Sequence, residues 1–116
     1  MILIIGAEAS GKREFAKSLG YAEGDFTTDP FDGKRVVYDV QDILFADHTR
    51  TEELYNALVD KAVVICNEVG SGVIPVERSV RLGREAAGRL CVLLAKDAAA
   101  VVRMVCGIPA VIKGQL

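Results

Sequence analysis

The chain has 116 residues, of which 51% are hydrophobic, and a formal net charge of −2. This length suits one folding unit with a single core, so residues 1–116 are interpreted as one domain. The balanced charge gives no long-range attraction for nucleic acid, and no apolar run is long enough to span a membrane. We therefore expect a cytoplasmic protein whose partners are neither nucleic acids nor membranes.

The apolar run at residues 2–5 leads directly into the sequence Gly6-Ala7-Glu8-Ala9-Ser10-Gly11-Lys12. A strand, a turn of small residues and a helix in this order are typical of a phosphate-binding loop, where backbone N–H groups and the positive end of the helix converge on phosphate oxygens. Lys12 would direct its charge toward the outer phosphates of a nucleotide. A glycine-containing connector without a ligand is the alternative. The residues expected to bind nucleotide are Gly6, Ala7, Glu8, Ala9, Ser10, Gly11, Lys12 and Arg13.

The loop motif is complete as far as the lysine and then departs from its usual form, because Arg13 stands where a serine or threonine is expected. That hydroxyl would ligate Mg²⁺, and a guanidinium has no lone pair to offer a metal. The sequence therefore predicts ATP or GTP as the bound cofactor and argues against ordinary Mg²⁺ coordination.

The remaining apolar runs are short and β-branched, as buried parallel strands should be, and helical patterns alternate with them. The expected strands cover residues 36–40, 63–66 and 101–106, and the expected helices cover residues 12–19, 52–60 and 76–97. Residues 21–34 have no apolar period and are interpreted as a loop. No room is left for a helix after residue 106, so residues 110–113 should return antiparallel as an edge hairpin. The prediction is an α/β fold with a mainly parallel sheet and helices on both faces.

Two strand ends carry polar residues that could act on a nucleotide. Asp39 lies at the carboxyl end of a predicted strand, where a carboxylate could orient metal-bound water beside the phosphate loop, or merely begin a turn. Asp42 is a lesser choice for the same role. Asn67, Glu68 and Gly70 follow the next strand, and ligands bind at this edge of open α/β sheets. A glycine-rich connector to the long helix is the alternative.

Several other residues have simpler interpretations. In the long helix, Ala86, Leu90, Leu93 and Leu94 make one apolar face. A second, charged face suits solvent or a subunit contact, although arginines near a phosphate site can also bind anions. Cys66, Cys91 and Cys106 lie in apolar stretches and are expected to be reduced core residues, and His48 is expected in an exposed loop.

The loop at residues 6–12, the stretch at residues 67–75, Arg81, Arg84 and residues 87–90, and the ending at residues 105–109 and 113–114 together resemble the adenosylcobinamide kinase / adenosylcobinamide-phosphate guanylyltransferase family of cobalamin biosynthesis. The resemblance covers residues 1–20 and 62–114 well, and residues 36–44 loosely. The segment between them is shorter than the family leads us to expect.

This resemblance implies a RecA-like P-loop core, usually in an oligomer, that phosphorylates a corrinoid hydroxyl with ATP or GTP and then transfers GMP through a histidine. By position, Lys12 would be catalytic, Asp39 would assist catalysis and would reach a metal through a bound water, and Asn67 and Glu68 would line the site. The acceptor histidine has no counterpart in residues 21–35, and His48 falls after the acidic strand. Ala9 and Arg13 also depart from the family's loop.

We therefore expect a short homo-oligomeric relative that binds a purine nucleotide and has lost guanylyl transfer. The sequence does not decide whether it acts as a kinase. The alternative is a catalytically degenerate nucleotide-binding or regulatory subunit.

Overall fold

The computed structural model describes residues 1–68 and 77–116. Its sheet has six strands in the order β2-β3-β4-β1-β5-β6, all parallel except the β5–β6 pair. The strands are β1 (Ile2–Gly6), β2 (Phe26–Thr27), β3 (Val36–Val37), β4 (Val63–Asn67), β5 (Ala100–Val105) and β6 (Ile108–Lys113). The α/β class, the parallel sheet and the antiparallel edge hairpin are therefore confirmed.

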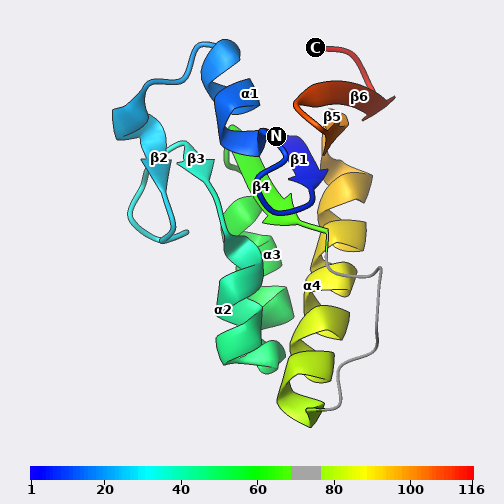
Figure 1. The fold of residues 1–116 in the computed structure, drawn as a ribbon. Coiled ribbons are helices and arrows are strands. Elements are labelled where there is room, and N and C mark those ends of the chain that lie inside the picture. Colours follow the sequence, from blue (N-terminus) through cyan, green and yellow to red (C-terminus); the bar gives the residue numbers. More distant parts are fainter. Residues whose placement is uncertain (69–76) are drawn as a thin grey trace.

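Helices cover the two faces of the sheet unequally, with α1 on one face and α2, α3 and α4 on the other (Figure 1). The α-helices are α1 (Lys12–Ser18), α2 (Val40–Ala46), α3 (Thr51–Leu58) and α4 (Arg78–Asp97), with 3₁₀ turns η1 (Glu23–Asp25) and η2 (His48–Arg50). Neighbouring residues of β1 point into the cores on opposite faces of the sheet, because side chains alternate along a strand. Leu3 packs with Leu44 and Leu90, whereas Ile4 packs with Ala16 beneath α1.

Two predicted segments differ from the observed fold. Residues 36–40 do not form one strand, because Asp39 adopts a left-handed conformation (φ 55°) after β3 and Val40 begins α2. Val40 is fully buried at the start of α2, and a short apolar run does not distinguish a strand from a buried helical turn. Residues 21–34 are not all loop, since Phe26 is buried, lies with its ring tilted toward that of Tyr38 and pairs with Val36 of β3.

Three side-chain predictions were also wrong in detail. Cys66 is buried and Cys91 is partly buried, but Cys106 is exposed because it lies in the β5–β6 turn. Leu93 is 37% exposed, although Ala86, Leu90 and Leu94 on the same helix are fully buried. His48 is half-buried within η2 rather than exposed in a loop. The helix predicted from residue 76 begins at Arg78, and Val76 lies outside the described residues.

The edge hairpin closes through Cys106 and Gly107, both with left-handed backbone (φ 50° and 77°). Two successive positive φ values match the twist of a two-residue hairpin turn. All six residues of β6 are exposed, including Ile108, Val111 and Ile112. Pro109 and Lys113 limit further strand pairing at this edge, because proline lacks an N–H group and a lysine must keep its charge solvated.

Candidate nucleotide-binding site

The loop between β1 and α1 has the compact backbone that a phosphate site requires. Ala9 and Gly11 both adopt left-handed conformations, with φ of 55° and 96°. A Cβ atom on Gly6 would lie 2.5 Å from Ser10 Oγ and 2.8 Å from the carbonyl oxygen of Met104. The loop packs directly against β5, and this close approach leaves room only for glycine at position 6. Alternating backbone conformations of this kind turn N–H groups toward a common point.

Lys12 is held inside this loop. Its residue exposure is 7%, and its Nζ atom donates to the carbonyl oxygen of Ala7 at 2.5 Å. Burial lowers the pKa of the Lys12 ammonium, while the nearby charges of Glu8 and Asp39 oppose that shift. The ammonium group is thus partly desolvated and surrounded by acceptors, and an anion in the loop would stabilise its charged form.

Two features of the loop lack a polar partner among the described residues. Ser10 Oγ is buried and makes no hydrogen bond. The N-terminus of α1 has no side-chain cap, since its N-cap residue is Gly11. A buried hydroxyl without a partner is unfavourable, and the first N–H groups of a helix need acceptors from outside the helix. Both needs would be met by the oxygens of one bound anion.

A hollow of about 280 Å³ opens over the loop and gathers residues from several strand ends. Its lining residues are Glu8, Ala9, Ser10, Gly11, Lys12, Arg13, Glu14, Asp39, Ile65 and Asn67. The fold thus brings the predicted loop together with Asp39 and Asn67, which lie far from it in sequence. The hollow is at the carboxyl edge of the parallel sheet, where α/β proteins bind ligands.

Asp39 enters the hollow from the N-cap position of α2, and its side chain makes no capping bond to that helix. Its carboxylate therefore stays available to a ligand. One turn later, burial raises the pKa of Asp42, and the charge of Asp39 adds to that effect. Asp42 and Asp39 also line a second hollow of about 440 Å³ beside the first.

Asn67 is held by two hydrogen bonds. Its Nδ2 atom donates to Glu8 Oε2 at 2.8 Å, and its backbone N–H donates to Gln41 Oε1 at 3.0 Å. Gln41 is only 3% exposed. Sequence reasoning missed this glutamine, because an amide on the buried side of a short helix has no motif of its own.

Glu68 has a different environment from Asn67. Its carboxylate accepts two bonds from Arg103 on β5, at 2.5 and 3.0 Å, and its backbone N–H donates to Gly6 at 2.8 Å. Glu68 is not among the residues that line the phosphate hollow. Its predicted role in the site stays a prediction, and Gly70 lies outside the described residues.

Arg13 is held beside the hollow by an aromatic ring. Its guanidinium carbon lies 4.9 Å from the centre of the Tyr38 ring, within the range of a cation–π contact. Arg13 also lines the hollow itself. A permanent positive charge therefore stands at the wall of the site, in the position where the usual motif has a hydroxyl.

The β5–β6 turn packs against the phosphate loop and holds its backbone. The backbone N–H of Gly107 donates to the carbonyl oxygen of Ser10 at 3.0 Å, and a Cβ on Gly11 would lie 3.2 Å from Gly107 Cα. No sequence pattern pointed to this contact, because it joins segments that are almost a full chain length apart.

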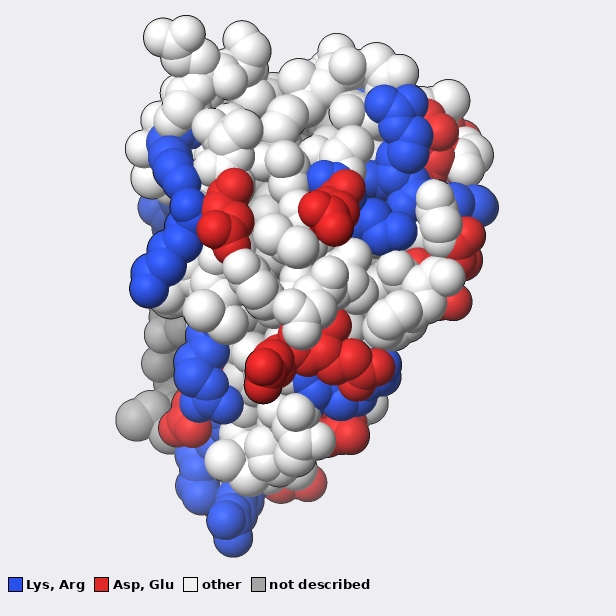
Figure 2. All heavy atoms as spheres, turned by 180° about the vertical axis from the view of Figure 1, so that it is seen from behind, with Lys and Arg blue, Asp and Glu red and all other residues white. Residues whose placement is uncertain are grey.

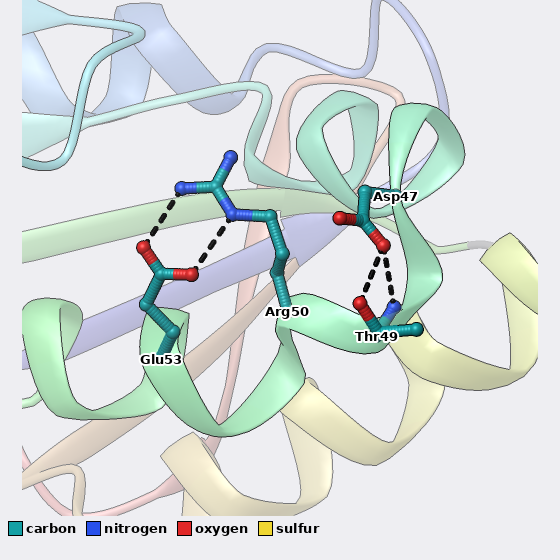
Figure 3. Close-up of polar contacts among 4 residues, drawn as sticks. All are labelled: Asp47, Thr49, Arg50 and Glu53. Atoms are coloured by element: carbon teal, nitrogen blue, oxygen red, sulfur yellow. Dashed lines mark hydrogen bonds and ion pairs between the residues drawn. The ribbon is translucent and has the colours of Figure 1, made fainter.

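The segment around His48 has its own polar contacts, which Figure 3 shows. Arg50 donates from Nε and Nη2 to Glu53, each at 3.0 Å, and Asp47 accepts from the backbone and hydroxyl of Thr49 at 3.0 and 2.6 Å. These bonds fix the turn between α2 and α3. His48 lines neither of the two hollows that meet at Asp39.

Among residues 1–68 and 77–116, no group of three or more histidine, cysteine or acidic side chains is arranged to hold a metal ion. Within the hollow, the carboxylates of Glu8, Glu14 and Asp39 are the acidic groups that accompany Lys12. Within the same described residues, no helix combines the length and the apolar character needed to cross a bilayer.

A mainly parallel sheet with a glycine loop and a buried lysine at its carboxyl edge defines the P-loop class of α/β proteins. The sequence pattern of the cobinamide kinase / cobinamide phosphate guanyltransferase family matches residues 34–112, which is more than half of the chain. The chain belongs to this family, whose members act on corrinoids with purine nucleotides in cobalamin biosynthesis. The phosphate loop itself precedes the matched residues. No curated protein matches the chain.

Proposed function

We propose that residues 1–116 act as one nucleotide-binding domain, which holds ATP or GTP through residues 6–12 and transfers the terminal phosphate to a corrinoid hydroxyl. The observation that carries this proposal is that one hollow is lined both by Ser10, whose buried hydroxyl has no partner, and by Lys12, whose ammonium group is held inside the loop. A triphosphate would supply acceptors to both groups and to the uncapped end of α1.

In this proposal each residue has a definite task. Lys12 exchanges the carbonyl oxygen of Ala7 for phosphate oxygens and neutralises charge on the transferring group. Asp39 lines the same hollow and orients the water of any metal that arrives with the nucleotide. Asn67, held by Glu8 and Gln41, fixes the wall at the end of β4.

The proposed activity stops at phosphoryl transfer. Guanylyl transfer requires a nucleophile that reaches the α-phosphate, and geometry decides this before basicity does. His48 is the chain's single histidine, and it lines neither hollow beside the loop. We therefore infer that no covalent guanylyl-enzyme forms.

A second function, a regulatory nucleotide-binding subunit without turnover, is favoured by Arg13 alone. Its guanidinium lies over Tyr38 at the wall of the hollow and replaces the hydroxyl that coordinates Mg²⁺. Phosphoryl transfer depends on the metal and on positioned charge, so this replacement suits binding better than turnover. Single-turnover assays with a cobinamide and ATP or GTP separate the two: phosphorylated product supports the kinase, and tight binding without product supports the regulatory subunit.

The shared step, nucleotide binding, is tested by calorimetric titration of ATP and GTP with and without Mg²⁺. Lys12→Ala should weaken binding at least about tenfold, the scale of one lost charge-assisted contact. Lys17→Ala is the matched control, because Lys17 lies on the same helix and is paired with Glu23 at its exposed surface. Equal affinities of the wild type and Lys12→Ala would contradict the assignment of the loop.

A further inference from the structure

Cys66, near the end of β4, and Cys91, in the middle of α4, meet in the core between the sheet and the helices. Cys66 is fully buried, and Cys91 packs against the same core from a partly buried position. Ala87, one turn before Cys91 on the same face of α4, is also fully buried in this core. Its small side chain lets the helix lie close to β4 at this level. The two thiols are therefore neighbours in space, although they come from different elements.

A hydrogen bond makes the two thiols unequal. The thiol of Cys66 donates to the sulfur of Cys91, which lowers the pKa of Cys91. The same bond, together with burial, raises the pKa of Cys66. A cysteine reacts with an oxidant as the thiolate, and the oxidant must reach its sulfur. Of the pair, Cys91 is the one suited to react first, and Cys66 is placed to react with the product.

Cys91 lies at the border between the core and the outer surface of α4. Figure 2 shows the molecule from behind, with basic side chains in a column along the side where α4 lies. Arg89 is exposed on this helix, whereas Leu90 is fully buried. Cys91 stands between buried Leu90 and Val92, which is 57% exposed. A sulfur that is partly open to solvent admits a small, uncharged oxidant such as hydrogen peroxide.

We propose that Cys91 and Cys66 are an oxidisable dithiol, in which Cys91 reacts first with hydrogen peroxide and the pair closes to a disulfide between α4 and β4. The Cys91 thiolate attacks one peroxide oxygen, the O–O bond breaks, and uptake of one proton gives a sulfenic acid and a water molecule. The Cys66 sulfur then attacks the Cys91 sulfur, the S–O bond breaks, and the Cys66 proton leaves with the hydroxyl group as a second water. The two thiols lose the two electrons that the peroxide gains, so no other reactant is needed.

The disulfide acts on the phosphate loop through Asn67. Cys66 Sγ lies 3.5 Å from the carbonyl oxygen of Asn67, and Asn67 Nδ2 donates to Glu8 Oε2 at 2.8 Å. Disulfide sulfurs are about 2.05 Å apart, closer than hydrogen-bonded ones, so β4 and α4 must draw together here. The displacement of Asn67 weakens its bond to Glu8, whose negative charge in the hollow then opposes a bound phosphate. This consequence rests on the proposed function, whereas the disulfide itself does not.

Treatment of the full chain with a stoichiometric amount of hydrogen peroxide, followed by mass spectrometry of non-reduced peptides, tests the disulfide. The background for all proteins is Cys106→Ser, because exposed Cys106 would otherwise link two chains. This protein should lose the mass of two hydrogen atoms and yield peptides linked through Cys66 and Cys91, which dithiothreitol separates. Cys66→Ala, with folding verified by circular dichroism, should instead retain a sulfenic acid at Cys91 that dimedone labels. Cys91→Ala should give neither product.

Failure to recover the linked peptides would overturn the proposal, and so would a sulfenic acid that forms at Cys66 in Cys91→Ala. Calorimetric titration of inorganic tripolyphosphate measures the consequence at the loop. The disulfide form should bind about fivefold more weakly than the reduced form, at the lower end of the usual coupling between two sites, and dithiothreitol should restore the affinity. Equal affinities of the two forms would refute the coupling through Asn67. Linked peptides from a protein whose reduced form binds no tripolyphosphate would support the dithiol and contradict the proposed function instead.

Discussion

Replacing Gly6 by alanine should damage the phosphate loop and the fold together. The added Cβ would lie 2.5 Å from Ser10 Oγ and 2.8 Å from the carbonyl oxygen of Met104. The serine side chain can rotate away, but the carbonyl belongs to β5, which pairs with every residue of β1. One of these two strands, or the loop between β1 and α1, must therefore move.

The expected cost of this overlap is about 2 kcal/mol, in the range found when extra atoms are forced into packed interiors. For a domain of this size, that loss lowers the melting temperature by about 8 °C. Because the displaced backbone carries the N–H groups of the loop, affinity for ATP, GTP and inorganic tripolyphosphate should fall as well.

Thermal unfolding followed by circular dichroism measures the first effect, and calorimetric titration of tripolyphosphate measures the second. Gly24→Ala is the matched control, because a Cβ there meets no atom within 4 Å and Gly24 is not among the glycines with positive φ. Its melting temperature should stay within about 2 °C of the wild type. If Gly6→Ala has the same melting temperature as Gly24→Ala and binds tripolyphosphate as tightly as the wild type does, the close packing of the loop on β5 is refuted.

Three further predictions concern the same site. Because burial lowers the pKa of Lys12, its ammonium loses its proton at a lower pH than an ordinary lysine. Nucleotide affinity should therefore start to fall earlier on raising the pH, and calorimetry across the alkaline range should show no such early fall in Lys12→Ala. Arg13→Ser should make binding more dependent on Mg²⁺, since a hydroxyl can coordinate the metal and a guanidinium cannot; an equal loss of affinity on adding EDTA to both proteins would contradict this. Incubation with GTP labelled at the α-phosphate should leave no label on the denatured protein, and acid-labile label that His48→Ala abolishes would show that guanylyl transfer persists.

The fold class could be predicted from the sequence because the apolar runs form the strands of the sheet. Residues 2–5 and 63–66 are continuous and β-branched, and both were found as buried parallel strands. The edge hairpin was also predictable, since too few residues separate β5 from β6 for a crossover helix. These features depend on local composition and on chain length alone.

The errors came from positions where tertiary contacts decide the conformation. Nothing local to residues 36–40 indicates that Asp39 turns left-handed and starts α2, because the buried valines on both sides suit a strand equally well. β2 consists of Phe26 and Thr27, and a strand of this length is too short to show an apolar period in the sequence.

The candidate site also contains residues that the sequence indicated and residues that it did not. The loop at residues 6–12 was visible as a motif, and Asp39 and Asn67, which the sequence places at strand ends, line the same hollow as the loop. Gln41, which holds the backbone of Asn67, and Gly107, which holds Ser10, could not be predicted. Each acts through a hydrogen bond to a distant segment, and such a bond leaves no trace in residue spacing.

The bond from Gly107 to Ser10 also bears on how the protein is made. Among the described strands, β1, which leads into the loop, pairs with β4 and β5, and β5 and the hairpin turn are synthesised almost a full chain length after it. A ribosome adds residues at about 5–20 per second, so this delay lasts about 5–20 s. During that time β1 has β4 as its available sheet neighbour but lacks β5, and the loop lacks its contact with Gly107. The contact order of the sheet is correspondingly high, which favours slow folding. The nascent chain should therefore gain affinity for phosphate abruptly, when the last hairpin docks, and should depend on chaperones until then.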